Sequence, residues 1–222
     1  MSLTPPKYQP MVGKVTLLNE QSSWTETSKG TDCEQYPTLK QIIPSQTCFS
    51  CDVCCRFLDQ QSHLAPIFTK EEFDKAIQAG LSADLFQNSR DGSSRQIRLK
   101  PYRDFFICPA FDPDTQQCTI YEHRPLDCQI YPLAIMRDVD GQKVVLGIDP
   151  ICPFAEAEIQ TPFFQHYVDH ISSFLESEII VNRIAQNRDL IGCFQENVVV
   201  VRQLTRLTEK VVAKIAPPTD PC

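Results

Sequence analysis

The cysteines of this 222-residue chain constrain it more than any other feature, because four of the 11 fall between positions 48 and 55. Two residues separate Cys48 from Cys51 and Cys51 from Cys54, and Cys55 follows directly. Thiolates are soft ligands that select zinc, Cu(I) and iron–sulfur clusters. This spacing lets a tight loop surround a metal centre with its backbone amides directed at the sulfurs. The stretch therefore predicts a metal site.

A second set of cysteines is predicted to complete the site. Cys108 and Cys152 each precede a proline, and Cys118 and Cys128 enclose the block Thr-Ile-Tyr-Glu-His-Arg-Pro-Leu-Asp. Bacterial ferredoxins also combine a C-x-x-C-x-x-C run with a Cys-Pro ligand. Because adjacent side chains diverge, the two neighbouring cysteines of the first stretch either serve two centres or include a spare. We expect eight ligands to converge, as two four-cysteine sites or as one site with reserve ligands: Cys48, Cys51, Cys54, Cys55, Cys108, Cys118, Cys128 and Cys152.

Two other roles for the cysteines compete with metal binding. A cysteine is often a small buried hydrophobe, but eight in two groups argue against that role. A disulfide scaffold needs an oxidising compartment, whereas Met1–Lys7 lacks the apolar region of a signal peptide. No stretch approaches the roughly 18 apolar residues of a membrane helix. We therefore expect a cytoplasmic protein with reduced thiols. The remaining cysteines are predicted not to be ligands: Cys33, Cys193 and Cys222.

The net charge of −7 and a pI near 5.1 argue against nucleic acid as a main partner, because phosphate binding needs clustered positive charge. We also expect no membrane partner, and the sequence does not identify the protein or small molecule that this chain contacts. One local exception to the acidic balance is a basic group, formed by Arg95, Arg98, Lys100 and Arg103. It is either a solvated strand edge or a patch for an anionic substrate or partner beside Cys108.

Polar residues between Cys118 and Cys128 are the candidates for contacts beyond the ligands. His123 and Arg124 are the predicted cofactor-binding pair, with Arg124 as an anion clamp and His123 as a proton donor or ligand. The alternative is that this cluster supports the ligands and packs locally, as groups around metal ligands commonly do.

The remaining pattern predicts an α+β fold with a cysteine-rich centre, short antiparallel strands and a helical C-terminal part. Thr69 and Glu72 form the capping box of a helix over 70–87. Further predicted elements are short strands at 97–99 and 105–107, a hairpin of 133–136 with 144–148, a helix over 162–186, and a second helix over 196–215 with a strand at 198–201 as its alternative. The predicted domains are an arm at 1–40, a metal-binding domain at 41–158, and C-terminal helices at 159–222 packed on it.

The two cysteine groups, together with Tyr131-Pro132, resemble the YkgJ-type cysteine-cluster family of zinc- or iron-chelating domains, which carries a CxxCxxCC signature. The resemblance covers roughly residues 45–155. It implies a metal centre held by the cysteines named above. Flagellin lysine N-methylases are similar through the same cysteine set, and in them the resemblance implies an iron–sulfur cluster. This chain differs from the family pattern at Gln129 and Phe154, which are not ligand positions.

Three functions follow from this pattern. The first is an iron–sulfur protein, expected to hold a 4Fe-4S cluster, with a redox, sensing or structural role. The second is a zinc-stabilised interaction module, and the third is an enzyme of methyl-transfer type. The number of thiolates favours iron–sulfur over zinc. The seven glycines include no G-x-G, so the usual methyl-donor loop is absent, and the sequence does not identify a reaction.

Overall fold

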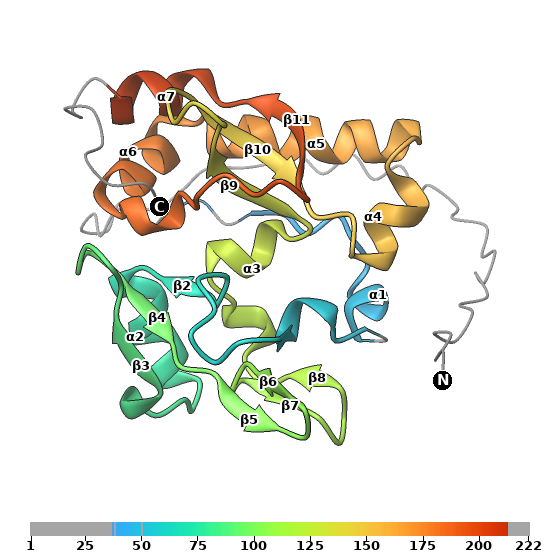
Figure 1. Ribbon diagram of the computed structural model, residues 1–222, viewed down its shortest axis with the longest axis vertical. Coiled ribbons are helices and arrows are strands. Elements are labelled where there is room, and N and C mark those ends of the chain that lie inside the picture. The colour runs from blue at the N-terminus through green and yellow to red at the C-terminus, as the bar shows by residue number, and fades with distance from the viewer. Residues whose placement is uncertain (1–36, 38, 50, 213–222) are drawn as a thin grey trace, which may run out of the picture. The chain divides into compact units, whose positions relative to one another are not determined.

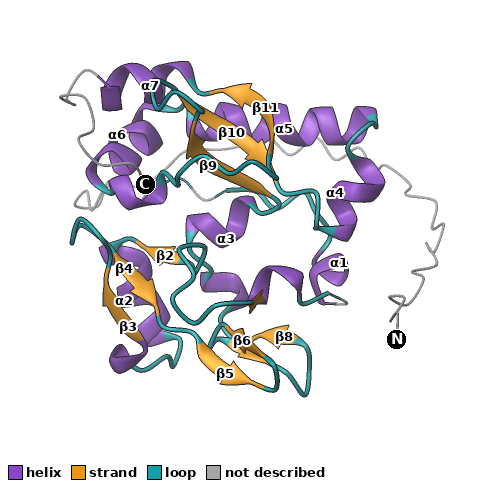
Figure 2. Cartoon of the chain, viewed as in Figure 1, coloured by secondary structure: helices purple, strands orange, loops and turns teal. Residues whose placement is uncertain are grey.

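The computed structural model describes residue 37 and residues 39–49 and 51–212 (Figure 1). Residue contacts divide the chain into units of 1–35 and 36–222, and only the second contains described residues. The predicted α+β class is confirmed, because this unit combines helices with short antiparallel sheets (Figure 2). Most of the predicted arm at 1–40 lies outside the described residues, as do Cys33 and Cys222.

The described helices are short except for α5. The α-helices are α1 Ser45–Phe49, α2 Lys70–Gln78, α3 Leu126–Ile130, α4 Pro153–Glu158, α5 Pro162–Leu175, α6 Glu178–Gln186 and α7 Thr205–Val212. The 3-10 turns are η1 Val53–Cys55, η2 Ala83–Leu85, η3 Tyr121–His123 and η4 Arg188–Leu190.

The strands pair into four small sheets. The strands are β1 Arg56–Phe57, β2 Ile67–Phe68, β3 Phe86–Asn88, β4 Arg95–Ile97, β5 Lys100–Tyr102, β6 Phe105–Ile107, β7 Phe111–Asp112, β8 Gln117–Cys118, β9 Leu133–Arg137, β10 Val144–Ile148 and β11 Val199–Gln203. Their orders are β1-β6-β5, β2-β4-β3, β7-β8 and β11-β10-β9, and every strand pair in them is antiparallel. The predicted hairpin is confirmed as β9 with β10.

Helix α2 begins where the sequence predicts and ends earlier. The capping box is present, with the Thr69 side chain accepting from the Glu72 backbone N and the Glu72 carboxylate accepting from the Thr69 N. The prediction of a helix to residue 87 is wrong beyond Gln78, because Gly80 adopts a φ of +105°. Gly80 N donates to Ile77 O and Leu81 N to Ala76 O, the hydrogen-bond pair of a Schellman motif that ends a helix.

Two predictions for the C-terminal part also need correction. The single helix over 162–186 is two helices, because Ser177 takes an extended conformation (φ −66°, ψ 145°) between α5 and α6. The preferred helix over 196–215 is wrong for 199–203, where the alternative strand is present as β11. This β-branched run pairs with β10, and such a pairing can outweigh helical periodicity. Within the predicted range, helix is present as α7 over Thr205–Val212.

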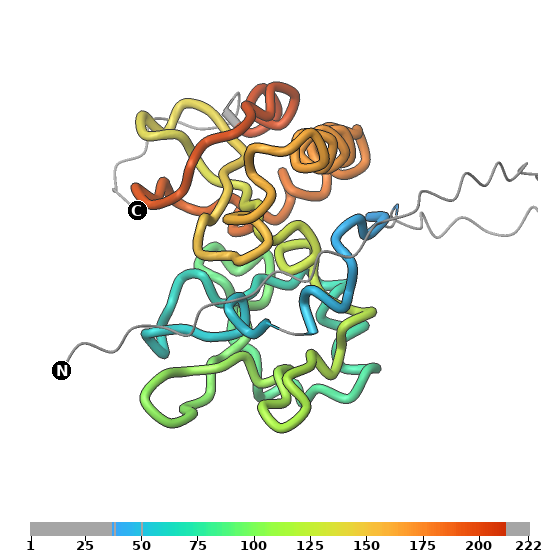
Figure 3. Tube along the Cα trace, turned by 90° about the vertical axis from the view of Figure 1, so that its right-hand side faces the viewer, coloured from blue at the N-terminus to red at the C-terminus, as the bar shows by residue number. Residues whose placement is uncertain are grey.

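The buried apolar residues form two main clusters. The larger core joins Ile43 and the segment from Leu126 to Ala155 with buried residues of α5, α6 and α7. It therefore includes residues on both sides of the proposed boundary at 158/159. The smaller core contains the buried apolar residues from Phe57 to Ile120, except Ile67, which belongs to the larger core. Figures 1 and 3 show α3 between the β9–β11 sheet and the sheets of the smaller core, so Cys128 lies where the two cores meet.

A buried ion pair joins elements of the two cores. Arg183 Nη2 on α6 lies 2.9 Å from Glu72 Oε1 on α2, and their side chains are only 10% and 7% exposed. Glu72 Oε1 also accepts from the backbone N of Leu126 at 2.8 Å. The first residue of α3 is thereby held by α2, and α2 by α6.

Candidate metal centre

The structure gathers most of the predicted ligands around one space. All eight predicted ligands are free thiols. A cavity of about 70 Å³ is lined by seven of them, together with apolar groups that include Phe68, Phe111 and Ile120. The seven cysteines are Cys48, Cys51, Cys54, Cys55, Cys108, Cys118 and Cys128. Cys152 does not line this cavity, although its pKa responds to the charges of Cys51 and Cys54.

Short strand pairings bring the remote cysteines to the first group. The register of β1 against β6 sets Arg56 opposite Ile107, and Cys108 N donates to Cys55 O at 3.0 Å. The register of β7 against β8 sets Phe111 opposite Cys118. Cys108 and Cys118 are therefore held at the cavity by backbone hydrogen bonds that do not depend on metal.

Helical turns place the other thiols. Cys48 lies on α1, and Cys51 N donates to Cys48 O at 3.2 Å, which closes the loop toward η1. Cys128 lies on α3, whose first turn is closed by Cys128 N donating to Pro125 O at 3.0 Å. Pro125 is the N-cap of α3. Cys152 is the N-cap of α4.

The sulfurs surround the cavity without meeting at one point. The Cys54 and Cys55 Sγ atoms are 3.9 Å apart. Among residues 39–49 and 51–212, no three His, Cys, Asp or Glu side chains are close enough to share one metal ion. A water needs only about 10–15 Å³ of such space, so this cavity is several times larger than one small guest requires. The ring of thiols therefore fits a guest larger than a single ion.

Burial keeps most of these thiols protonated in the metal-free protein. Desolvation, reinforced by the charge of neighbouring cysteines, raises the pKa of Cys108 to about 12 and that of Cys128 well above its usual range. Desolvation likewise raises the pKa of Cys152 to about 11. In contrast, a hydrogen bond from Cys55 lowers the pKa of Cys54. If these thiols lost their protons, the resulting thiolates would repel one another. A bound cation stabilises such thiolates and therefore deprotonates the thiols that coordinate it.

Arg124 and Tyr121 supply the polar part of the cavity wall. The Arg124 guanidinium carbon lies 3.5 Å from the centroid of the Tyr121 ring, and Arg124 Nε donates to Tyr121 O at 2.8 Å. The positive charge of Arg124 counteracts the burial that raises the pKa of Cys48 and Cys118. The Tyr121 hydroxyl is buried and has no hydrogen-bond partner at good geometry among the described residues.

His123 lies outside the cavity, unlike Arg124, with which it was predicted to form a cofactor-binding pair. His123 is exposed and does not line the cavity, and its side chain makes no hydrogen bond or ion pair with the part of the chain that the structure describes. Gln41 was not predicted, yet it lines the cavity and accepts from Arg124 Nη2 at 3.2 Å. No spacing or motif marks Gln41, because it reaches the site only through the fold.

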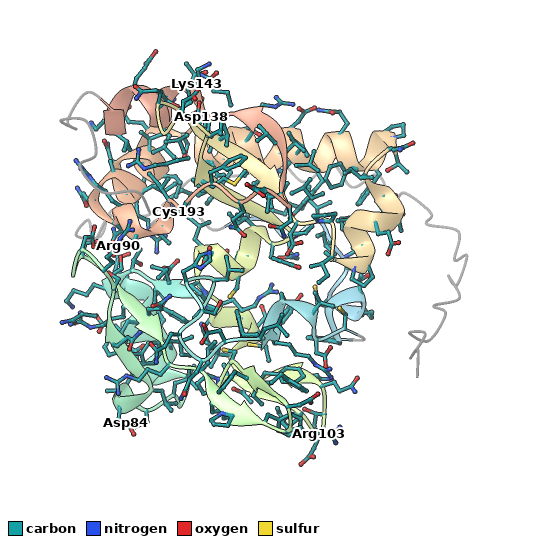
Figure 4. All side chains as sticks on the ribbon, viewed as in Figure 1. Asp84, Arg90, Arg103, Asp138, Lys143 and Cys193 are labelled. Atoms are coloured by element: carbon teal, nitrogen blue, oxygen red, sulfur yellow. The ribbon has the colours of Figure 1, made fainter. Side chains whose placement is uncertain are left out.

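The basic group divides between two sheets. Arg95 lies on β4 and donates to Asn88 Oδ1 at 2.5 Å, whereas Lys100 lies on β5. Arg103, with a φ of 56°, sits at the turn after β5 and points outward (Figure 4). Of this basic group, Lys100 is the residue whose charge lowers the pKa of Cys108, against the larger effect of burial. This arrangement favours the solvated strand edge over a single anion-binding patch.

Cys193 stands apart from the thiol cavity. It lies after η4, next to Gly192, which bridges to Met136 of β9. Figure 4 places it in the half of the structure that holds the β9–β11 sheet. Cys193 is disulfide-bonded, which differs from the expectation of reduced thiols and leaves this residue unavailable as a ligand.

Comparison with known families gives one match. Residues 47–153 match the family CxxCxxCC, described as "Putative zinc- or iron-chelating domain". Comparisons with curated proteins and with solved structures gave no match. Within the described residues, every helix is too short or too polar to cross a membrane. The matched segment spans all eight predicted ligands, and this segment of the chain is therefore identified as a CxxCxxCC domain.

Proposed function

We propose that this protein holds an iron–sulfur centre, of the 4Fe-4S kind, and uses it in a redox, sensing or structural role. The observation that carries the proposal is the single cavity of about 70 Å³ with seven free thiols in its wall. Iron–sulfur clusters are held by cysteine thiolates. The candidate ligands are these seven residues together with Cys152.

The number and spacing of the thiols support a cluster over one zinc ion. Structural zinc takes four ligands in a closed tetrahedron, with each sulfur about 2.3 Å from the metal. In the described residues no three ligand side chains converge on one point, although their backbones are tied by hydrogen bonds. A polynuclear guest can contact sulfurs that lie farther apart than the ligands of a single ion.

The surroundings of the cavity support a role in electron exchange. Apolar side chains such as Phe68 and Phe111 shelter most of the wall, whereas Cys54 is exposed. The Arg124 charge lies on the same wall. Net charge, hydrogen bonds to sulfur and solvent exposure set the reduction potential of such centres. An edge open at Cys54 gives an electron partner a short route to the centre.

Zinc is the second candidate, because eight thiols are sufficient for two four-cysteine sites and the family description names zinc as well as iron. A methyl-transfer activity has no specific observation in its favour among the described residues. We also propose a cytoplasmic location, because reduced thiols persist there and the eight candidate ligands are free thiols, although Cys193 is disulfide-bonded.

The test is anaerobic purification of the full chain, followed by iron, acid-labile sulfide and zinc analysis. We expect iron and sulfide in equal amounts, with a visible absorption that decreases on reduction. Cys118→Ser should lower both contents, whereas Ser62→Ala, on a loop outside the cavity, should leave them unchanged. Stoichiometric zinc without iron or sulfide would refute the iron–sulfur proposal.

A further inference from the structure

A second cavity lies against the thiol-lined one. It measures about 430 Å³ and shares Gln41, Tyr121 and Arg124 with the first cavity. We call it the outer cavity. Its size falls within the roughly 300–1,000 Å³ of small-molecule sites. The volume and the shared wall together mean that a small molecule in the outer cavity would lie beside the thiol cavity.

The outer cavity carries one charge of each sign. Arg124 and Glu122 both line it. Neither forms an ion pair with another described residue. Arg124 is held in place by stacking on Tyr121 and by its hydrogen bond to Gln41. The guanidinium is thus oriented in advance, which reduces the conformational entropy lost when a ligand binds.

The rest of the wall is uncharged. Gln129 and Ser45 offer hydrogen-bonding groups, and the Gln129 side chain is positioned by a 2.6 Å bond from its Nε2 to Arg124 O. Ile42 and Pro44 provide an apolar side. No further charged side chain lines this cavity among the described residues. A ligand with a single net charge would satisfy one of the two ionic groups and be repelled by the other.

We propose that the outer cavity binds a small zwitterion of the amino-acid class. Its carboxylate pairs with Arg124, because guanidinium groups match carboxylates in a two-point geometry. Its ammonium group pairs with Glu122, and an apolar side chain lies against Ile42 and Pro44. This inference goes beyond the iron–sulfur proposal and does not depend on which metal is bound.

The test is isothermal titration calorimetry of the full chain with three matched probes. Each probe is titrated into the protein as purified and into the protein after metal removal. L-Leucine carries both charges, L-leucinamide lacks the carboxylate, and 4-methylpentanoate lacks the amine. Hydrogen bonds to charged groups contribute about 1.5–3 kcal/mol, so each truncated probe should bind at least about ten-fold more weakly than leucine. Metal and sulfide analysis of the same samples reports separately on the iron–sulfur proposal.

Two variants assign the charges. Glu122→Gln should weaken leucine binding at least about ten-fold without weakening the binding of 4-methylpentanoate. Arg124→Gln should weaken the binding of both compounds. The Glu122 side chain is exposed and forms no ion pair with the described residues, so its variant is expected to fold. Glu209→Gln and Arg103→Gln, two exposed positions outside the cavity, serve as controls and should leave binding unchanged. The proposal is overturned if leucine does not bind, or if its affinity is the same in Glu122→Gln as in the wild type.

Discussion

Removal of Arg183 tests whether the buried ion pair joins the two cores. The variant Arg183→Met keeps a long side chain and deletes the guanidinium. Glu72, with a side chain 7% exposed, would then carry a buried charge without its cation. Breaking a buried pair in this way typically costs about 3–5 kcal/mol.

The surviving hydrogen bonds set the expected value near the lower end of that range. Glu72 would still accept from the Leu126 N at 2.8 Å and from the Thr69 N and Oγ1 at 2.9 Å. These three donors compensate part of the buried charge. Arg183 Nη2 also donates to Thr69 Oγ1 at 2.9 Å, and that bond is lost in the variant. We therefore expect a loss of about 3 kcal/mol in the free energy of unfolding.

The assay is equilibrium urea unfolding of the metal-free, reduced protein, because bound metal makes unfolding depart from two-state behaviour. The matched control is Lys70→Met, which breaks the ion pair with Asp74 on the same helix. Those side chains are 85% and 47% exposed, and an exposed pair of this kind contributes only about 0.3–0.5 kcal/mol. If Arg183→Met costs no more than the control, the ion pair does not hold the cores together.

Four further substitutions test the structure. Cys51→Ser and Cys128→Ser should each lower the metal content, because both residues line the thiol cavity. Amide hydrogen exchange should then increase most near Cys108 and Cys118. Full metal content in either variant would contradict the shared site. Gly80→Ala should lower the free energy of unfolding, measured with urea, by about 1 kcal/mol, because its φ of +105° disfavours a side chain. A Cβ at this position would meet no atom within 4 Å, so no steric clash adds to this value. An unchanged unfolding midpoint would contradict the prediction. Asp127 is a half-buried acid, and desolvation raises its pKa to about 6, above the usual value near 3.9. The metal-free native state therefore binds more protons than the unfolded state, and stability should fall as pH rises from about 4 to about 6. Asp127→Asn should remove this fall and stabilise the metal-free protein at neutral pH by up to about 3 kcal/mol, as measured by unfolding across pH; an unchanged pH profile would contradict the assignment.

The sequence by itself determined the features that depend on local chemistry. The spacing of Cys48, Cys51 and Cys54 indicated a metal site because neighbouring thiolates in a tight loop have few other uses, and the family match agrees with that prediction. The capping box at Thr69 and the hairpin before Cys152 were predicted from residues close in the chain. In each case the interacting groups lie within a few residues of one another or follow a simple alternation.

Only the tertiary structure decided which distant residues meet. Val199 to Gln203 form a strand because β10 supplies hydrogen-bond partners about 55 residues away in sequence, and no periodicity reveals such a partner. Gln41 reaches Arg124, and Arg183 reaches Glu72, through the packing of elements whose local sequence carries no sign of the contact. The outer cavity exists for the same reason, since it lies between the segment that begins at Leu39 and the turn at Tyr121. Contacts of this kind depend on the whole chain finding one arrangement in which both cores are buried.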